Sequence, residues 1–214
     1  MREPPVTLIV LAKEPVAGRV KTRLCPPCSH AEAAELAAAA LADTLEVVAA
    51  TPAARRILAI DGRPPPGVPA GFEVIGQRGR GLDERLAATF DDVGGPALLV
   101  GMDTPQLTTD LLSAAVLELS TPGVDAVIGH TDDGGWWTIG LRRPDPRVFL
   151  GVPMSAPTTG AAQVDRLLSL GLHTTTLPIL TDVDTFETAA SVAAVAPDTR
   201  FARTLERLAV GFLG

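Results

Sequence analysis

The chain has 214 residues, an apolar fraction of 46% and a formal net charge of −7. This length and apolar content suit one α/β domain, so we expect residues 1–214 to form a single domain with a sizeable core. An acidic chain without a basic tract is a poor candidate for binding nucleic acid or an anionic membrane surface. No apolar run is long enough for a membrane span or a secretory signal, so the sequence indicates a cytoplasmic protein.

Strand and helix patterns alternate along the chain. The first is a continuous aliphatic run at 6–12, typical of a buried central strand. Ser29 then stands where an N-cap is expected for an alanine-rich helix that continues to Ala50. The later segments are, in chain order, a strand at 55–61, a loop at 63–71, a strand at 72–77, a helix at 82–93, a strand at 96–103, a helix at 108–120, strands at 125–131 and 136–142, a helix at 158–171, a strand at 173–179, and helices at about 185–195 and 198–212.

This alternation predicts the α/β class, as a three-layer α/β/α sandwich with a mostly parallel sheet. In such folds ligands bind beyond the carboxyl ends of the strands, where the strand order reverses. The segments of interest are therefore the loops after the strands at 6–12, 72–77 and 96–103, together with the DDGG turn at 132–135.

The loop after the first strand, KEPVAGRVKTRL, concentrates positive charge. Arg19, Lys21 and Arg23 fall within five residues, and Lys13 precedes them. Lys13 and Lys21 are the only two lysines in the chain. A loop shaped by Gly18, with exposed amides and several cations, suits a diphosphate or triphosphate. It matches neither the Walker P-loop nor the GxGxxG pattern, and the alternative is a solvated basic turn.

Aspartates mark two further segments. Asp103, in GMDTP, ends a buried strand, where a carboxylate can reach a Mg²⁺ or Mn²⁺ ion that also holds phosphate oxygens. Asp182 and Asp184, in TDVDTF, alternate, so in an extended segment they point the same way and could complete that metal site. In both segments the alternative role is a helix cap or a turn.

The segment HTDDGGWWTIGL places two acids on a Gly-Gly turn between strands. Asp132 and Asp133 are either turn formers, the commonest role, or a base or hydrogen-bond acceptor for a second substrate. Trp136 and Trp137 are neighbours in a strand and face opposite sides. One is therefore expected in the core, and the other could form the wall of a pocket.

The segment CPPCSH has the outline of a metal or redox motif, with Cys25, Cys28 and His30. A structural Zn²⁺ needs four ligands, and His130 and His173 have no ligand-spaced partner. A thioredoxin-like CxxC follows a strand directly, whereas this one follows a long charged loop. Two cysteines without a catalytic role are the favoured interpretation, and a redox or zinc protein is the alternative.

The order LIVLAKEPVAGRVKTRL, GQRGRGLDERLAATF, GMDTPQL, DDGGWWTIGL and DVDT resembles the bacterial family labelled radical-SAM/selenodomain-associated transferase 1. That family belongs to the GT-A-like nucleotide-diphospho-sugar transferase superfamily and is similar, more distantly, to 2-phospholactate guanylyltransferase and the molybdenum-cofactor nucleotidyltransferases. The resemblance implies a GT-A-like fold and a Mg²⁺- or Mn²⁺-dependent glycosyltransferase or nucleotidyltransferase. Its partners would be a nucleoside triphosphate or nucleotide sugar and a small-molecule acceptor. A non-catalytic nucleotide-binding module is the alternative.

The resemblance also implies roles for individual residues. The nucleotide phosphates would be held by the first loop, through Lys13, Gly18, Arg19, Lys21 and Arg23. The base would lie near Gly79, Gly81 and Leu82. The metal would be held by Asp103 and Asp184, with Asp182 as a further candidate. Independently of the resemblance, the charges of these loops predict Lys21 and Arg23 as catalytic residues that stabilise charge on the leaving phosphate, and Asp133 as a catalytic residue that serves the acceptor. RGLDER and WWTIGL depart from the family pattern and leave base and acceptor specificity open.

Overall fold

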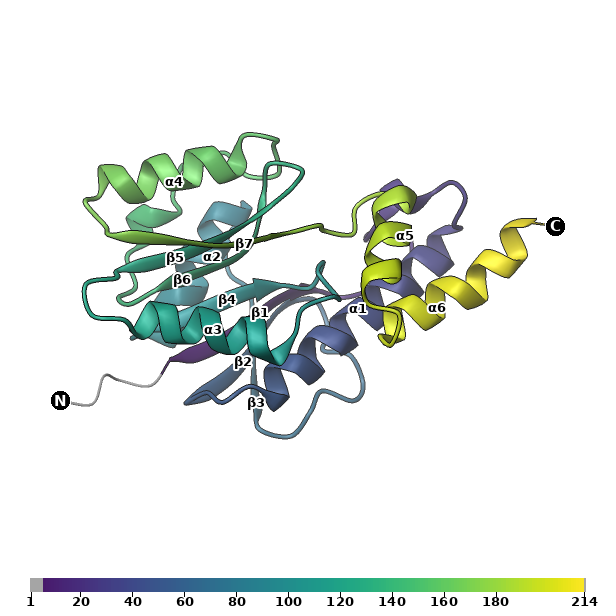
Figure 1. Ribbon diagram of the computed structural model, residues 1–214, viewed down its shortest axis with the longest axis horizontal. Helices are drawn as coiled ribbons and strands as arrows, with labels where there is room; N and C mark the ends of the chain where they lie inside the picture. Colours follow the sequence, from purple (N-terminus) through teal and green to yellow (C-terminus); the bar gives the residue numbers. More distant parts are fainter. Residues whose placement is uncertain (1–5, 214) are drawn as a thin grey trace.

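The structure is a computed structural model that describes residues 6–213. The outermost residues of the predicted domain, 1–5 and 214, lie outside the described part of the chain. Within it, one sheet of seven strands runs through the molecule (Figure 1). The strand order across the sheet is β3 (Phe72–Gly76), β2 (Arg55–Asp61), β1 (Thr7–Lys13), β4 (Ala97–Gly101), β6 (Trp136–Leu141), β5 (Ala126–Thr131) and β7 (Thr174–Leu180).

The strands of this sheet are parallel except for β6. β1 pairs in parallel with both β2 and β4, and β5 pairs in parallel with β7. β6 is antiparallel to its two neighbours, β4 and β5. The predicted mostly parallel, mixed sheet is therefore confirmed. β1 and β4, the strand before GMDTP, are neighbours in the sheet, with Val10 opposite Val100.

Helices cover both faces of the sheet. One apolar layer packs the sheet against α1 (His30–Ala50) and α3 (Thr109–Ser120). The other packs it against α2 (Leu82–Val93) and α4 (Thr159–Ser169). β1 contributes side chains to both apolar layers, because alternate side chains of a strand face opposite sides of the sheet. Leu8 and Val10 lie in the first layer, and Ile9 lies in the second. The predicted three-layer α/β/α sandwich is confirmed.

A third apolar cluster extends the fold at the C-terminal end. α5 (Phe186–Val195) and α6 (Arg200–Ala209) pack on the face of α1 that is turned away from the sheet. Leu36 of α1 lies in this cluster, whereas Leu41 lies against the sheet. α1 begins with a reciprocal cap, in which Ser29 and Glu32 each accept a hydrogen bond from the other's backbone amide. The N-cap predicted at Ser29 is confirmed.

One predicted strand is shorter than expected. The strand expected at 96–103 ends at Gly101, because the chain turns at 102–107 and the amide of Leu107 donates to the carbonyl of Thr104. Asp103 therefore lies in a loop, two residues beyond the strand. The described residues also include three short 3₁₀ segments, η1 (Thr22–Leu24), η2 (Pro146–Val148) and η3 (Val210–Leu213). Among the described helices, none combines the length and the apolar character that crossing a bilayer requires.

Asp43 of α1 joins α6 to the rest of the fold. Its carboxylate is almost fully buried and accepts from the amides of Arg200 and Phe201 at 3.0 and 2.8 Å. Asp43→Ala should lower the free energy of unfolding by about 1–3 kcal/mol, because the buried amide of Phe201 and the partly buried amide of Arg200 lose their acceptor. Glu46→Ala removes the exposed ion-pair partner of Arg200 and should change the free energy by less than about 0.5 kcal/mol. Urea unfolding of both variants measures the difference, and equal effects would contradict this role of Asp43.

Candidate active site

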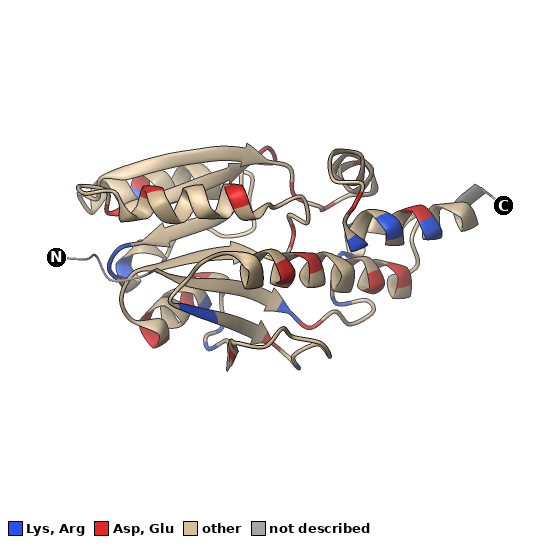
Figure 2. Ribbon diagram, turned by 60° about the horizontal axis from the view of Figure 1, so that its bottom comes forward, with Lys and Arg blue, Asp and Glu red and all other residues tan. Residues whose placement is uncertain are grey.

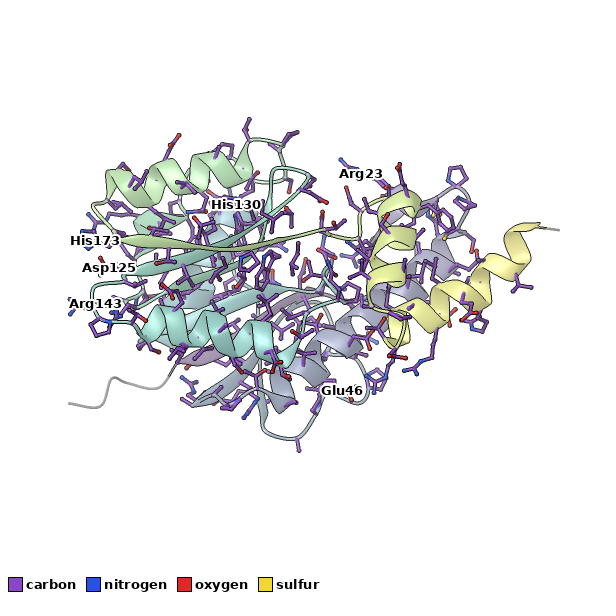
Figure 3. The ribbon with its side chains drawn as sticks, in the orientation of Figure 1. Arg23, Glu46, Asp125, His130, Arg143 and His173 are labelled. Carbon is purple, nitrogen blue, oxygen red and sulfur yellow. The ribbon has the colours of Figure 1, made fainter. Side chains whose placement is uncertain are left out.

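The loops with charged residues meet at one edge of the sheet. β1, β4, β5 and β7 run in the same direction, so their carboxyl ends lie on one side, and antiparallel β6 begins there. Several acidic residues lie in the loops between the sheet and the C-terminal helices (Figure 2). Arg23 projects beside α5 at this end, whereas Asp125, Arg143 and His173 lie at the opposite end of the sheet (Figure 3).

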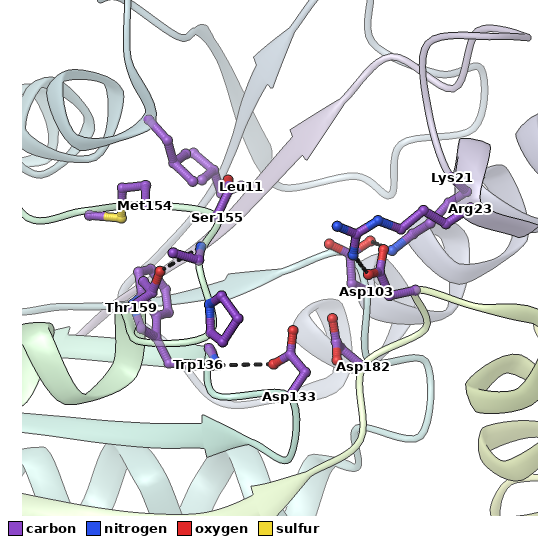
Figure 4. Close-up of a pocket in the computed structure, with 15 residues that line it drawn as sticks. Leu11, Lys21, Arg23, Asp103, Asp133, Trp136, Met154, Ser155, Thr159 and Asp182 are labelled. Carbon is purple, nitrogen blue, oxygen red and sulfur yellow. Dashed lines mark hydrogen bonds and ion pairs between the residues drawn. The ribbon is translucent and has the colours of Figure 1, made fainter.

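A first cavity, here called the aspartate cavity, opens at this edge and measures about 420 Å³ (Figure 4). Four carboxylates and two cations line it, namely Asp103, Asp133, Asp182, Asp184, Lys21 and Arg23. The remaining wall is formed by Leu11, Leu82, Gly135, Trp136, Met154, Ser155, Ala156, Pro157 and Thr159. The charged residues come from four loops that are far apart in the sequence.

A second cavity, here called the lysine cavity, adjoins the first and also measures about 420 Å³. Its own wall consists of Ala12, Lys13, Asp61, Gln77, Arg85 and Met102. It shares Leu11, Leu82, Asp103 and Ser155 with the aspartate cavity. The two cavities therefore form one continuous groove at the carboxyl ends of β1, β2 and β4.

Lys21 joins three of the loops that form the groove. Its backbone adopts a left-handed conformation, with φ of 49°, which is uncommon for a residue other than glycine. Its side chain is only 11% exposed, and Nζ lies 2.5 Å from Oδ1 of Asp103. The same ammonium donates to the carbonyl of Val183, and the Val183 amide donates to the Asp103 carbonyl at 2.8 Å. Lys21 thus connects the first loop to both loops that were predicted to bind metal.

Arg23 and Asp184 form a second link across the groove, as an ion pair. Arg23 is 72% exposed, so this pair is more open to solvent than the pair of Lys21 and Asp103. Thr185, rather than Asp184, is the N-cap of α5, in a reciprocal cap with Thr188. The Asp184 side chain is therefore not used for capping and lies on the wall of the aspartate cavity.

The carboxylates crowd Asp182. Burial and the facing carboxylate of Asp133 raise the pKa of Asp182 to about 6, although Lys21 opposes the shift. Asp103 and Asp184 add smaller contributions that also raise this pKa. Within residues 6–213, no three His, Cys, Asp or Glu side chains already converge in the arrangement that holds a metal ion.

Asp133 has both a structural contact and an open side. Its Oδ1 accepts from the Thr131 hydroxyl at 2.5 Å and from the Gly135 amide at 2.9 Å, so it stabilises the turn. The same side chain lines the aspartate cavity and approaches Asp182 (Figure 4). Gly134 makes the turn possible, because its φ is +91° and a Cβ there would lie 2.0 Å from the carbonyl oxygen of Pro157.

The two tryptophans divide as the strand pattern predicted. Trp137 is buried in the core, and its Nε1 donates to the carbonyl of Pro178 at 3.0 Å. Trp136 faces the other way and forms part of the aspartate cavity wall. The prediction that one tryptophan lies in the core and the other beside a pocket is confirmed.

The other predicted binding residues are distributed unevenly. Lys13 lines the lysine cavity, and Leu82 lines both cavities. In the described chain, neither cavity wall includes Gly18, Arg19, Gly79 or Gly81. Gly79 and Gly81 shape the turn before α2, where the amide of Arg80 donates to Glu84 at 2.7 Å.

Several lining residues were not predicted from the sequence. In the lysine cavity these are Asp61, Gln77 and Arg85, and in the aspartate cavity they are Met154, Ser155, Pro157 and Thr159. Asp61 and Gln77 follow the rule that strand ends carry ligands, which could have singled them out. The segment 154–159 gave no signal beyond Pro157, because its place in the site depends on how the chain folds back onto the Gly134 turn, where the Gly160 amide donates to the Gly134 carbonyl at 2.8 Å.

The cysteines lie outside both cavities. Cys28 is buried in the apolar cluster of α1, α5 and α6, and Cys25 packs against that cluster. Both are free thiols. Burial raises the pKa of Cys28, with Glu32 adding to the effect, so its reactive thiolate form is disfavoured at neutral pH.

A family model described as "Uncharacterized protein conserved in bacteria (DUF2064)" matches residues 33–156, more than half of the chain. The chain belongs to this family. A search of curated proteins finds no match. The description of this family names no activity.

Solved structures agree with the predicted superfamily. The chain is 26% identical to a candidate nucleotide-diphospho-sugar transferase from Desulfovibrio desulfuricans G20, with a TM-score of 0.80 over 94% of this chain and 93% of that chain. CMP:2-keto-3-deoxy-manno-octonic acid synthetase, solved with CTP, has 14% identity and a TM-score of 0.59 over 90% and 98% of the two chains. Rv0371C of Mycobacterium tuberculosis H37Rv, solved with manganese, has 18% identity and a TM-score of 0.50 over 88% and 98%. The GT-A-like fold and the superfamily resemblance are confirmed.

The crowding of Asp182 predicts a pH-dependent gain in stability on its removal. A folded-state pKa near 6, above the usual 3.8, means that the folded chain holds this proton more tightly than the unfolded chain. The free energy of unfolding therefore falls as pH rises from about 4 to 6, and the full cost is present above that range. Without divalent metal, Asp182→Asn should raise the melting temperature at pH 7.5 by about 2–4 °C, and by much less at pH 4.

Thermal unfolding in EDTA at both pH values measures this effect. Asp165→Asn, an exposed change on α4, is the matched control and should show no such pH dependence. A melting temperature of Asp182→Asn at or below that of the parent at pH 7.5 would show that the carboxylate is not destabilising.

Proposed function

We propose that the protein is a Mg²⁺- or Mn²⁺-dependent transferase that uses an activated nucleotide and a small-molecule acceptor. The observation that carries the proposal is the aspartate cavity, where Lys21 and Arg23 face four carboxylates at the carboxyl ends of the strands. The similarity to a candidate nucleotide-diphospho-sugar transferase at 26% identity, over nearly the full length of both chains, supports the same conclusion. The continuous lysine cavity offers room for the rest of the nucleotide.

The side chains of the cavity fit a hard divalent cation. All four acids offer carboxylate oxygens, which Mg²⁺ and Mn²⁺ prefer, and no sulfur ligand lines the cavity within the described chain except the thioether of Met154. Mg²⁺ usually takes one or two protein carboxylates and completes its shell with phosphate oxygens and water, so a preformed cluster of three is not required. Asp103 and Asp184 would hold the ion, with Asp182 beside them. When bound, the ion would neutralise charge on the phosphates.

The cations would act on the phosphates from the other side. Lys21 and Arg23 lie in the aspartate cavity and would stabilise negative charge as it develops on the leaving phosphate. Both are already oriented, Lys21 by Asp103 and Val183, and Arg23 by Asp184, so little rearrangement is needed at the moment of reaction. Lys13 would hold the nucleotide in the lysine cavity. Gly18 and Arg19 would shape the loop that connects Lys13 to Lys21.

Asp133 would serve the acceptor. Its Oδ1 is held by the turn, which leaves the other carboxylate oxygen to take the proton of an attacking hydroxyl. In nucleotidyl transfer the hydroxyl oxygen of the acceptor bonds to the α-phosphorus of a nucleoside triphosphate, and pyrophosphate leaves. In glycosyl transfer it bonds to the anomeric carbon of a nucleotide sugar and a nucleoside diphosphate leaves. In both cases the leaving group would depart toward Lys21 and Arg23.

Metal-dependent nucleotide binding is the first test. Nucleoside triphosphates and nucleotide sugars should raise the melting temperature with Mg²⁺ or Mn²⁺ present and much less with EDTA, because ligands of the folded state stabilise it by mass action. Asp103→Asn should abolish the metal-dependent part of the shift, and Asp165→Asn on the surface of α4 should retain it. Equal shifts with and without metal, unaffected by Asp103→Asn, would indicate a non-catalytic nucleotide-binding module and contradict the metal site.

Loss of Lys21 should impair turnover. Once an acceptor is found, Lys21→Ala should lower kcat by about a hundredfold or more, because it removes a preorganised charge that stabilises the leaving phosphate. Arg143→Ala, at the opposite end of the sheet, is the control. Release of pyrophosphate or of a nucleoside diphosphate identifies the reaction. A loss of less than about threefold, in a variant that circular dichroism shows to be folded, would count against the phosphate role.

A further inference from the structure

Gln77 lines the lysine cavity at the carboxyl end of β3, an edge strand of the sheet. It directly follows β3, and its amide donates to the Ile60 carbonyl of β2 at 3.0 Å. One strand further in, Asp61 of β2 stands opposite Lys13 of β1. The ends of three adjacent parallel strands therefore place Lys13, Asp61 and Gln77 close to one another, and all three side chains line the cavity.

The orientation of the Gln77 amide is set by the backbone. Its Nε2 donates to the carbonyl of Ala12 at 2.7 Å and to the carbonyl of Ala59 at 3.0 Å. Both amide hydrogens are thus used, and a rotated amide would place oxygen against two carbonyl oxygens. The side chain therefore presents Oε1 away from the backbone.

Oε1 of Gln77 is available to a ligand. Within residues 6–213 no group donates to it, and it is absent from the set of buried polar atoms that lack a partner. An acceptor that is neither bonded within the protein nor enclosed by it must be open, and the cavity is the space that Gln77 lines. Oε1 is thus a hydrogen-bond acceptor of fixed orientation that can accept from a donor group of a ligand.

The surroundings of Gln77 suit a flat, polar-edged ring. Asp61 adds a second acceptor, because one carboxylate oxygen takes the Arg85 guanidinium at 2.6 Å and the other takes no hydrogen bond from the described chain. Arg85 is itself held by the Gly79 carbonyl at 3.3 Å. Leu11 and Leu82 supply apolar wall where the lysine cavity meets the aspartate cavity.

We propose that the lysine cavity selects nucleotides whose base carries an exocyclic amino group, with Gln77 Oε1 as the acceptor that reads it. This inference rests on the proposed nucleotide-using function. An amino group on adenine, cytosine or guanine donates to Oε1. A base with an oxo group at the same position directs a carbonyl oxygen at a carbonyl oxygen, and it can offer Oε1 its ring N–H only by shifting in the cavity.

Pairs of nucleotides that differ only in that group test the proposal on the unaltered protein. Calorimetric titration with Mg²⁺ present compares CTP with UTP, ATP with ITP, and GTP with XTP. The tightest ligand of the six should carry an amino group, and its oxo counterpart should bind at least about tenfold more weakly, as sites that hydrogen-bond a polar group reject analogues that lack it.

A substitution at Gln77 tests whether this side chain is responsible. Gln77→Met should reduce the preference for the amino nucleotide to less than about threefold, measured as the ratio of the two Kd values. Gln106→Met is the matched control, because the Gln106 side-chain amide also donates to a backbone carbonyl, that of Thr181, yet lines neither cavity. It should alter both Kd values alike and leave their ratio unchanged.

The outcomes separate this inference from the function on which it rests. If an oxo nucleotide binds as tightly as its amino counterpart, or more tightly, the base selectivity is overturned while nucleotide use stands. If neither a nucleoside triphosphate nor a nucleotide sugar binds with Mg²⁺ or Mn²⁺ present, both the base selectivity and the nucleotide-using function are overturned. If Gln77→Met fails to fold, the three nucleotide pairs on the parent protein still decide the selectivity. An unchanged ratio in a folded Gln77→Met variant would assign the selectivity to another residue.

Discussion

The ammonium group of Lys21 is the contact on which the candidate site depends. It lies 2.5 Å from the Asp103 carboxylate and also bonds the carbonyl of Val183, so one side chain holds three loops in place. The Lys21 side chain is only 11% exposed and that of Asp103 is 44% exposed, so this pair is less open to solvent than the pair of Arg23 and Asp184. The pair of Arg23 and Asp184 adds a second, more exposed link between the first loop and the loop before α5.

Several carboxylates lie close together in the aspartate cavity, and their proximity lowers the stability of the folded state. Four aspartates line one cavity with two cations, and the pKa of Asp182 is raised to about 6. Asp103 and Asp184 are paired with cations, but burial and repulsion from Asp133 disfavour the charged form of Asp182, which lowers the stability of the folded state at neutral pH. The proposed function would account for this arrangement, because a bound divalent cation would neutralise the acids and phosphates would meet Lys21 and Arg23.

Much of the fold could be predicted because each element carries its own local signal. The helix at 82–93 and the strand at 55–61 have the predicted bounds, since both are delimited by loop-forming residues and have a clear apolar pattern. The strand at 96–103 was overextended, because the turn after Gly101 is fixed by a hydrogen bond between Leu107 and Thr104 that composition does not reveal. Some residues predicted for the site, such as Arg19 and Gly79, belong to loops at this end of the sheet, but they line neither cavity in the described chain.

The sequence by itself determined the order of strands and helices, the mixed sheet, and the loops in which chemistry was to be expected. Local periodicity, caps and charge clusters carry that information, because they act within a few residues. The tertiary structure decided which side chains meet. The pairing of Lys21 with Asp103, the approach of Asp133 to Asp182 and the fixed amide of Gln77 depend on contacts between residues far apart in the chain. Such contacts follow from how the strand ends align, and no local pattern encodes them.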